Sequence, residues 1–151
     1  MKTWKVTAIA TLALGGCAPA HLVKPPAPTV PEQATSIVVY REPAFLSMAG
    51  TAIFGVDGQD YVELWNKEVY TTKIPAGTHD FFVRSMGADR PNVLTIDAKP
   101  GRTICFSTRA NPALYGMMWI PFSYYFSHAY LIERIKCAEP REGYTNTLDR
   151  I

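Results

Sequence analysis

Hydrophobic and polar residues alternate over short stretches along most of the chain, a pattern typical of β-strands with one buried face. From Ser36 onward, apolar runs rich in β-branched and aromatic residues are separated by turn residues. No stretch has the 3.6-residue period of a long amphipathic helix. The pattern predicts about eight strands, at 37–40, 51–56, 61–65, 69–74, 79–85, 93–98, 102–109 and about 128–136.

The residues between these runs predict how the strands are joined. Asp57-Gly58 predicts a type I′ hairpin turn. Pro75-Ala76-Gly77 suits a turn with proline at its second position, and Pro100-Gly101 suits a type II turn. The fold class predicted is therefore all-β, an antiparallel β-sandwich of seven or eight strands. The segment after Pro140 leaves room for a short helix, although Gly143 weakens it.

The first 16 residues differ from the rest of the chain. Lys2 and Lys5 precede a nine-residue apolar stretch, Val6 to Leu14. Nine residues are too few to span a bilayer, which needs about 20, but they suit the central part of a secretory signal peptide. We therefore expect residues 1–16 to be removed on export.

The residues at the end of this segment, Leu14-Gly15-Gly16-Cys17, resemble the lipobox of bacterial lipoproteins. The resemblance implies diacylglycerol on the Cys17 sulfur, cleavage before Cys17 and acylation of its new amino group. Two or more acyl chains give stable membrane anchoring, whereas one gives marginal binding. By analogy with lipoprotein sorting, Ala18 rather than Asp after the cysteine implies the periplasmic face of an outer membrane, in a cell that has one.

A proline-rich stretch follows the cysteine. Five of the 19 residues from Ala18 to Ser36 are proline, which excludes a packed helix or central strand and favours polyproline II. At about 3.1 Å per residue, this tether reaches up to about 60 Å. The chain thus divides into a signal peptide (1–16), a lipidated cysteine with a tether (17–36) and a β-sandwich domain (37–151).

Removal of the signal peptide changes the charge. The full chain has 15 basic and 13 acidic residues, a formal net charge of +2, but Lys2 and Lys5 leave with residues 1–16 and the mature chain is neutral. A neutral chain has no basic excess to neutralise phosphates, which argues against a nucleic-acid partner held by bulk electrostatics. With 48% hydrophobic residues, the chain is also unlike a disordered one.

A second resemblance concerns the domain. The stretch 73–83, KIPAGTHDFFV, resembles the "strand, Pro-Gly turn, His, strand" signature of PEGA-like β-sandwich modules. With Val56-Asp57-Gly58 before it and 99–103 after it, the chain from about Ile37 to Ile135 resembles a family of small bacterial lipoproteins with an uncharacterised PEGA-like domain. The resemblance implies an immunoglobulin-like sandwich and supplies no catalytic residues.

Cys105 and Cys137 are the cysteines that remain once Cys17 is lipidated. An even pair in an oxidising compartment favours a disulfide. If their strands are neighbours, the closed loop contributes about 3–4 kcal/mol. Two free thiols, or a redox or metal role, are the alternatives, although neither cysteine lies in a Cys-x-x-Cys motif.

Other chemistry is sparsely indicated. The histidines, His21, His79 and His128, form no metal-binding motif. His79 and Asp80 are not expected to be a catalytic pair, because neighbouring residues on a strand point to opposite faces. The sequence lacks a Gly-x-Ser-x-Gly elbow, a phosphate-binding glycine-rich loop and an obvious pair of catalytic carboxylates. We expect no cofactor, no metal and no catalysis.

The most unusual segment is Ala110 to Ile132, whose 23 residues carry no charge. A transmembrane helix has the right length, but Gly116, Pro121 and polar residues interrupt it. A core hairpin of the sandwich is the second interpretation. The third is a partly exposed aromatic loop, with Gly116 to Pro121 at its tip, that touches a membrane surface or a partner protein. The candidate interaction residues are Tyr115, Met117, Met118, Trp119, Phe122 and Tyr124.

These features favour a non-catalytic, membrane-anchored periplasmic lipoprotein that binds or scaffolds another envelope protein. A carrier of a small apolar ligand is the alternative, and an envelope enzyme without a recognisable motif is a further one. A concave apolar cavity near Trp119 and Phe126 would favour the carrier, and a convex aromatic ridge would favour the interaction module.

Overall fold

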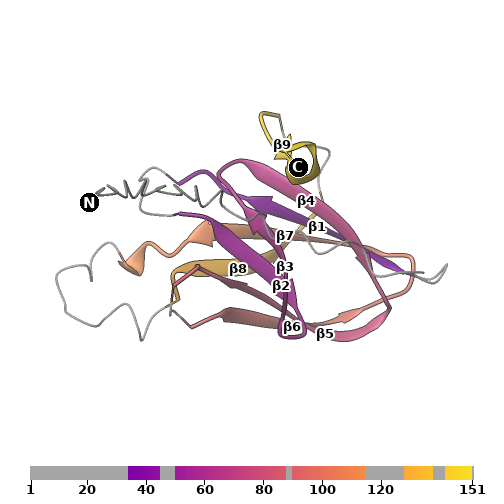
Figure 1. Cartoon of the computed structure of the whole chain (residues 1–151). Coiled ribbons are helices and arrows are strands. Elements are labelled where there is room, and N and C mark those ends of the chain that lie inside the picture. Colours follow the sequence, from indigo (N-terminus) through magenta and orange to yellow (C-terminus); the bar gives the residue numbers. More distant parts are fainter. Residues whose placement is uncertain (1–33, 45–49, 88–89, 115–127, 138–141, 151) are drawn as a thin grey trace, which may run out of the picture.

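The structure, a computed structural model, describes residues 34–44, 50–87, 90–114, 128–137 and 142–150 (Figure 1). Within them two β-sheets stack on each other, which confirms the predicted all-β sandwich. The eight longer strands are β1 (Thr35–Arg41), β2 (Ala52–Val56), β3 (Gln59–Leu64), β4 (Glu68–Ile74), β5 (Gly77–Arg84), β6 (Asn92–Ala98), β7 (Thr103–Ala110) and β8 (Tyr130–Ile135). Two short elements follow, β9 (Thr145–Asn146) and the 3-10 helix η3 (Thr147–Arg150).

The two sheets divide the strands unevenly. One sheet has the order β8-β7-β1-β4-β9 and the other has the order β3-β2-β5-β6. The pairings are antiparallel, as predicted, except that β1 runs parallel to β7 and β4 runs parallel to β9. β1 and β7 are parallel because both strands begin at the same end of the sandwich.

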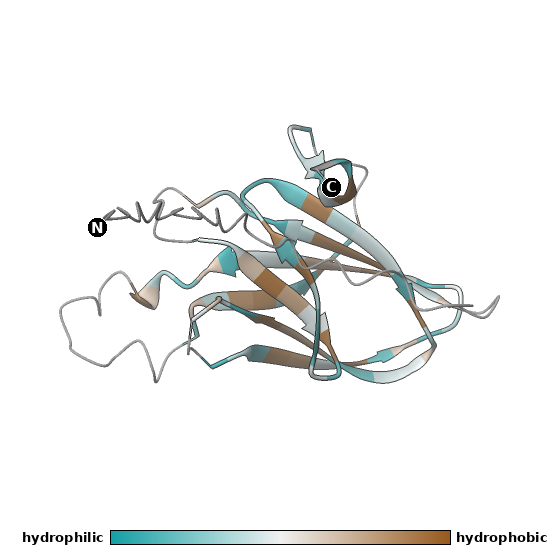
Figure 2. Ribbon diagram, viewed as in Figure 1, coloured by the Kyte–Doolittle hydropathy of each residue, from teal (hydrophilic) through white to brown (hydrophobic). Residues whose placement is uncertain are grey.

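The core lies between the sheets because every second side chain of each strand points inward. In β1, Ile37 and Val39 are completely buried. Three aromatic rings from β2, β5 and β7 fill the middle, where Phe81 and Phe106 have centroids 4.7 Å apart and Phe54 packs against both. Figure 2 shows the resulting alternation of hydrophobic and hydrophilic residues along the strands.

Two predicted turns have the backbone geometry that their sequences require. Asp57 and Gly58 have φ values of +51° and +74°, and a type I′ turn needs positive φ at both positions. Gly101 has φ +65°, as the third residue of a type II turn does, and the Arg102 N–H donates to the Lys99 carbonyl at 3.3 Å.

A glycine in β2 permits a close approach between strands. Gly55 lies at a register shift in the pairing of β2 with β3, and its partner on β5 is Phe82. A Cβ atom at position 55 would lie 2.2 Å from the Phe82 ring and 2.3 Å from the Gln59 carbonyl oxygen. The Phe82 ring therefore covers the backbone of β2, and it is 7% exposed although it lies on the outer side of the sheet.

The two ends of the sandwich differ in the connections between their strands. We call the tether end the one where β1 begins, with the turns 57–58, 75–76 and 99–102 beside it. The Gly101 N–H donates to the Ala34 carbonyl there at 3.2 Å, so the chain enters beside the turn 99–102. We call the loop end the opposite one, where β7 ends and β8 begins, at the left of Figure 1.

The C-terminal residues were expected to leave room for a short helix. They form β9 and η3, which lie along the start of β4. The Thr147 hydroxyl donates to the Val69 carbonyl at 3.1 Å, and Thr147 is buried. No helix of the described residues is long and apolar enough to cross a membrane.

Candidate functional site

The predicted interaction residues, Tyr115, Met117, Met118, Trp119, Phe122 and Tyr124, lie outside the described residues, as does Cys17. The structure does describe the two flanks of the aromatic segment. Ala110 at the end of β7 pairs with Tyr130 at the start of β8, so the segment begins and ends at the loop end. The three interpretations of the segment remain open on this structure.

Asn111 closes the base of this segment. Its backbone N–H donates to the Ala129 carbonyl at 2.9 Å, and its side-chain amide donates to the His128 carbonyl at 2.8 Å. Its Oδ1 accepts from the Ala113 N–H at 3.1 Å. His128 extends the connection, because its Nδ1 lies 3.0 Å from the carbonyl oxygen of Arg90, ahead of β6. Hydrogen bonds thus fix the described residues on both sides of the segment, Asn111 and His128.

A buried cation lies near this base. Arg41, at the end of β1, has no exposed surface, and its guanidinium carbon lies 4.7 Å from the centre of the Tyr130 ring. Its Nη1 donates to the Glu42 carbonyl at 2.8 Å. A guanidinium stays charged in a protein, so its burial needs compensating contacts such as this cation–π interaction. Sequence analysis missed Arg41, because nothing in its neighbours marks a buried arginine.

Glu42 links three parts of the five-stranded sheet at the loop end. Its carboxylate accepts from the Ser107 hydroxyl at 2.9 Å and from the Tyr144 hydroxyl at 2.8 Å. The Tyr144 ring also packs edge-on against Tyr40 at 5.5 Å. These contacts fix the C-terminal residues against β1 and β7.

Four large hydrophobic side chains are exposed among the described residues, and two of them flank the start of β2 at the loop end. Trp65, after β3, is 45% exposed, and Met86, after β5, is 72% exposed. Both strands pair with β2, so these residues lie on either side of its start, about 10 Å apart at two strand spacings. Exposed aromatic and methionine side chains are typical of surfaces that bind other molecules.

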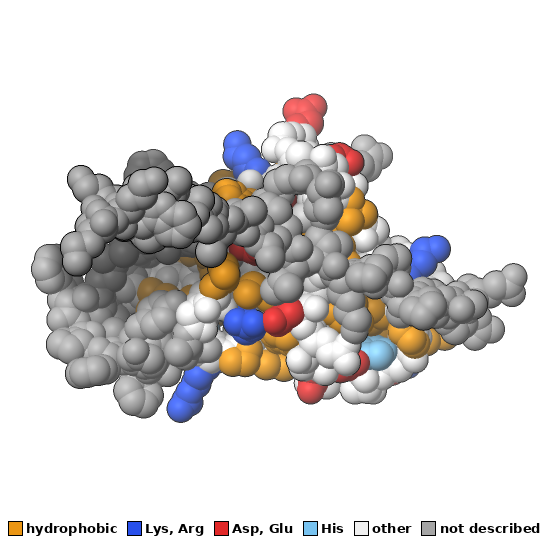
Figure 3. All heavy atoms as spheres, in the orientation of Figure 1, with side chains coloured by type: hydrophobic (Ala, Val, Ile, Leu, Met, Phe, Trp, Pro, Cys, Tyr) orange, Lys and Arg blue, Asp and Glu red, His pale blue; other side chains and the backbone are white. Residues whose placement is uncertain are grey.

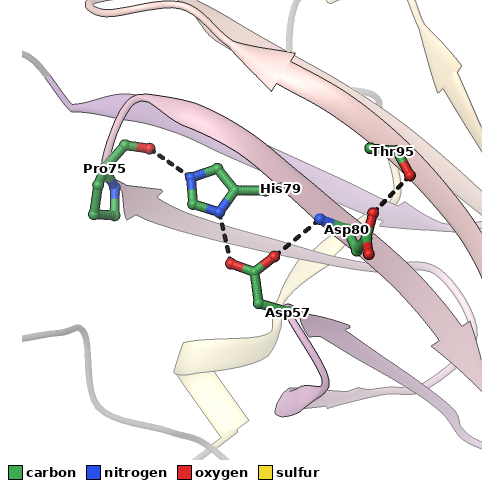
Figure 4. Close-up of polar contacts among 5 residues, drawn as sticks. All are labelled: Asp57, Pro75, His79, Asp80 and Thr95. Atoms are coloured by element: carbon green, nitrogen blue, oxygen red, sulfur yellow. Dashed lines mark hydrogen bonds and ion pairs between the residues drawn. The ribbon is translucent and has the colours of Figure 1, made fainter.

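A polar network occupies the tether end (Figure 4). His79 Nδ1 lies 2.6 Å from an Asp57 carboxylate oxygen, and its Nε2 lies 3.1 Å from the Pro75 carbonyl oxygen. The other Asp57 oxygen accepts from the Asp80 N–H at 2.9 Å. On the outer side of the sheet, the Thr95 hydroxyl donates to the Asp80 carboxylate at 2.6 Å.

This network joins two motifs that the sequence presents separately. Asp57 belongs to the β2–β3 hairpin turn and His79 follows the Pro75-Ala76-Gly77 turn, 22 residues away. They meet because β2 and β5 are antiparallel partners with Val56 opposite Phe81. In the sequence, the acidic residue next to His79 is Asp80. Asp57 becomes its partner only through the register of β2 with β5.

The contacts define the protonation of this pair. A carbonyl oxygen and a carboxylate only accept, so His79 makes both of its contacts as hydrogen bonds when both ring nitrogens carry a proton. Burial by itself would raise the pKa of Asp57, but the hydrogen bonds from His79 and the Asp80 N–H, with the charge of His79, outweigh burial and lower that pKa below 3.8. The pair therefore links two turns through close polar contacts on both sides of the His79 ring.

The network has the arrangement of a structural clamp. The second ring nitrogen of His79 contacts a backbone carbonyl, where a catalytic histidine would contact a nucleophile or a substrate. His79 and Asp80 point to opposite faces of β5, as expected, since His79 packs against the core residue Phe81 and Asp80 bonds across to Thr95. Among the described residues, no group of three His, Cys, Asp or Glu side chains could hold a metal ion.

The remaining predicted pair, Cys105 and Cys137, stands at disulfide distance. Their Cα atoms lie 5.2 Å apart, and Cys105 is buried on β7 while Cys137 follows β8. The strands are neighbours, with Cys105 opposite Ile135, which is the condition on which the prediction depended.

No protein-family model matches the chain, and no curated protein is significantly similar to it. The resemblance to PEGA-like lipoproteins therefore stays a prediction, and the function has to be argued from the geometry.

Proposed function

We propose that this protein is a non-catalytic lipoprotein, anchored through Cys17 on the periplasmic face of the outer membrane, that binds or scaffolds another envelope protein. The binding surface is the loop end, with the aromatic residues from Tyr115 to Tyr124 as its main contacts. The lipid anchor and the tether supply attachment, and the sandwich supplies a rigid support.

The separation of the two ends carries this proposal. The tether enters at Ala34, at one end, and the aromatic segment leaves after Leu114 and returns at His128, at the other. A seven-residue strand at about 3.3 Å per residue separates the ends by roughly 23 Å. A partner at the loop end can therefore be bound without competing with the membrane attachment.

The exposed side chains of the loop end support a binding role. Trp65 and Met86 extend an apolar surface beyond the aromatic segment itself. Hydrogen bonds of Asn111 and His128 fix the base of the segment, so the support for the proposed contacts is already in place before a partner binds.

The packing of the sandwich favours this function over a ligand carrier. Phe54, Phe81 and Phe106 occupy the space between the sheets where a lipocalin-like cavity would lie. A carrier would need a cavity formed by the aromatic segment alone.

The anchor is tested with Cys17→Ala. Cells expressing this variant and the wild type are given labelled palmitate, and membranes are washed at about 1 M salt, where the Debye length is about 3 Å and surface charge interactions are screened. We expect the variant to lack the label and to leave the membrane. Retention equal to the wild type after this wash would contradict the anchor.

The binding surface is tested by affinity capture of the lipidated protein after cross-linking. We expect Trp119→Ser to lose one or more reproducible protein partners. The matched control is Val93→Ser, because Val93 is a half-exposed hydrophobic side chain at the same end of the sandwich but outside the aromatic segment, so it separates the segment from the rest of this end. Identical partners for the wild type and Trp119→Ser would contradict the proposed surface.

A further inference from the structure

Charges are scattered over the face seen in Figure 3, where acidic and basic side chains stand among hydrophobic ones. The tether end of the five-stranded sheet differs. Lys73 lies near the end of β4, Arg102 precedes β7, and Arg134 and Lys136 lie at the end of β8. All four side chains are exposed, and we call them the basic surface.

The basic surface surrounds the entry of the tether. Ser36, at the start of β1, pairs with Lys73 on one side and with Thr103 on the other. The Ser36 N–H also donates to the Arg102 carbonyl at 2.9 Å. Two of the four cations thus flank the point where the chain joins the domain, and the other two lie one strand further along.

The acidic residues described at this end are engaged on the other sheet. Asp97 pairs with Lys99, Asp57 with His79, and Asp80 accepts from Thr95. On the five-stranded sheet, Glu133 precedes Arg134 but is paired with Arg109 at 3.7 Å. Among the described residues, the ion pairs involve none of the four cations.

A shallow hollow lies within this surface. It has a volume of about 450 Å³ and opens beside the disulfide pair, on the edge formed by β7 and β8. Its lining combines two cations, a hydroxyl and apolar atoms, which suits a phosphate group attached to a less polar body. The lining residues are Thr103, Cys105, Arg134, Ile135, Lys136 and Cys137.

We propose that the basic surface contacts anionic phospholipid headgroups, with a headgroup phosphate in the hollow between Arg134 and Lys136. This inference rests on the proposed function for the membrane that the tether reaches. Lysine and arginine near an anionic membrane are attracted to it, and the attraction falls off within a Debye length. The contact would hold the domain with its tether end toward the bilayer and its loop end toward a partner.

A membrane is the ligand proposed for the basic surface because the tether enters the domain beside it. The tether that begins at the lipid-modified cysteine ends at Ala34, next to Arg102, so the nearest anionic surface is the one that holds the anchor. The mature chain is neutral as a whole, so the attraction comes from the placement of these four charges rather than from net charge.

The experiment uses the mature chain, residues 17–151, with Cys17→Ala, so that binding depends neither on acylation nor on the basic and apolar residues 1–16. Binding is measured by sedimentation with vesicles of phosphatidylglycerol and phosphatidylcholine, and with phosphatidylcholine alone. We expect binding only to the anionic vesicles, and release as salt is raised. Equal binding to both vesicles, or none to either at low salt, would contradict the proposal.

A charge-matched pair of variants tests the placement. Arg134→Glu/Lys136→Glu changes the basic surface, and Lys67→Glu/Arg90→Glu makes the same change in net charge at exposed residues of the loop end. We expect the first to weaken binding on the order of 30-fold or more and the second to change it less than about threefold. Equal effects would show that net charge alone matters, which would overturn the proposal. Thermal unfolding of each variant checks that it is folded.

The two proposals fail separately. If the unlipidated chain does not bind vesicles, the proposal for the basic surface is wrong, and the lipidated protein is still retained on membranes at high salt. If Cys17→Ala is retained on membranes after the high-salt wash, the proposed anchor is wrong, and the result of the vesicle experiment is not affected.

Discussion

At the tether end, short turns and the disulfide pair join neighbouring strands directly, whereas at the loop end the long aromatic segment joins β7 to β8 and its base is fixed by hydrogen bonds. The His79–Asp57 pair connects two turns at the first end. At the second, Asn111 holds the base of the aromatic segment, and Trp65 and Met86 are exposed. One end is built for stability and the other presents surface, so the changes below should affect stability and binding unequally.

Breaking the disulfide pair should have the largest effect. Cys105→Ala/Cys137→Ala should lower the free energy of unfolding by about 3–4 kcal/mol, because the bridge closes a loop of 32 residues in the unfolded chain. Equilibrium unfolding in urea measures the change. Reduced wild-type protein is the control and should fall by a similar amount. A difference below about 1 kcal/mol would show that the pair does not fasten this end.

Gly55→Ala should be next, at about 1–3 kcal/mol or more, because the new methyl group meets the Phe82 ring and a backbone carbonyl at less than 2.5 Å. The control is Gly143→Ala, where φ is +80° but no atom lies within 4 Å, and backbone strain alone should cost about 1 kcal/mol. Thermal unfolding compares them. Equal losses would contradict the close packing of β2 against β5.

At the loop end, Asn111→Ala should cost about 1–2 kcal/mol, since it removes two side-chain hydrogen bonds that are only partly buried. Faster hydrogen exchange should be confined to the base of the segment, at the amides of Asn111 and Ala113. Asn66→Ala, which removes one exposed bond to the Ala44 N–H at the same end, is the control and should cost less. Exchange that rises equally across the core strands would mean that this base supports the whole sandwich.

His79→Gln should cost about 1–2 kcal/mol, because both N–H donors of glutamine lie on one nitrogen and cannot replace the contacts that the two ring nitrogens make with Asp57 and Pro75. Equilibrium unfolding in urea measures the change. His128→Gln, which affects one contact at the loop end, is the control. A loss no larger than that of the control would contradict a structural role for the contacts of His79.

The smallest effect concerns acid. The pKa of Asp57 is lowered in the folded protein, so the stability that its carboxylate contributes is present above about pH 3.8 and is lost as the pH falls below that value. Because its side chain is 54% exposed, the contribution should stay below about 1 kcal/mol. Unfolding in urea at pH 3 and pH 6 should show a smaller difference for Asp57→Asn than for the wild type. An equal difference would assign the acid sensitivity to other carboxylates.

Local sequence signals predicted much of the fold. Period-two alternation located β1 to β8, and Asp57-Gly58 and Pro100-Gly101 predicted turns whose φ values fit. These features depend on a few neighbouring residues. β9 was not predicted, because its two residues have no alternation and pair with β4 only after the sheet has formed. The parallel pairing of β1 with β7 likewise joins strands far apart in the sequence.

Less of the candidate site could be predicted. The Cys105–Cys137 pair was predicted because, once Cys17 is assigned to the lipid, the two remaining cysteines can pair only with each other. The contact between His79 and Asp57 requires the β2–β5 register, and the burial of Arg41 depends on Tyr130 across the sheet. Neither contact can be predicted from the spacing of residues in the sequence, because each joins residues that only the fold brings together.

The orientation of the domain tests the account most directly. A genetically encoded fluorophore is placed at position 76 or at position 86 of the lipidated protein, which is bound to anionic vesicles whose headgroups carry nitroxide quenchers. The account predicts strong quenching at position 76, in an exposed turn of the tether end outside the basic surface, and little at position 86, at the loop end. Equal quenching at both positions, or stronger quenching at position 86, would contradict it.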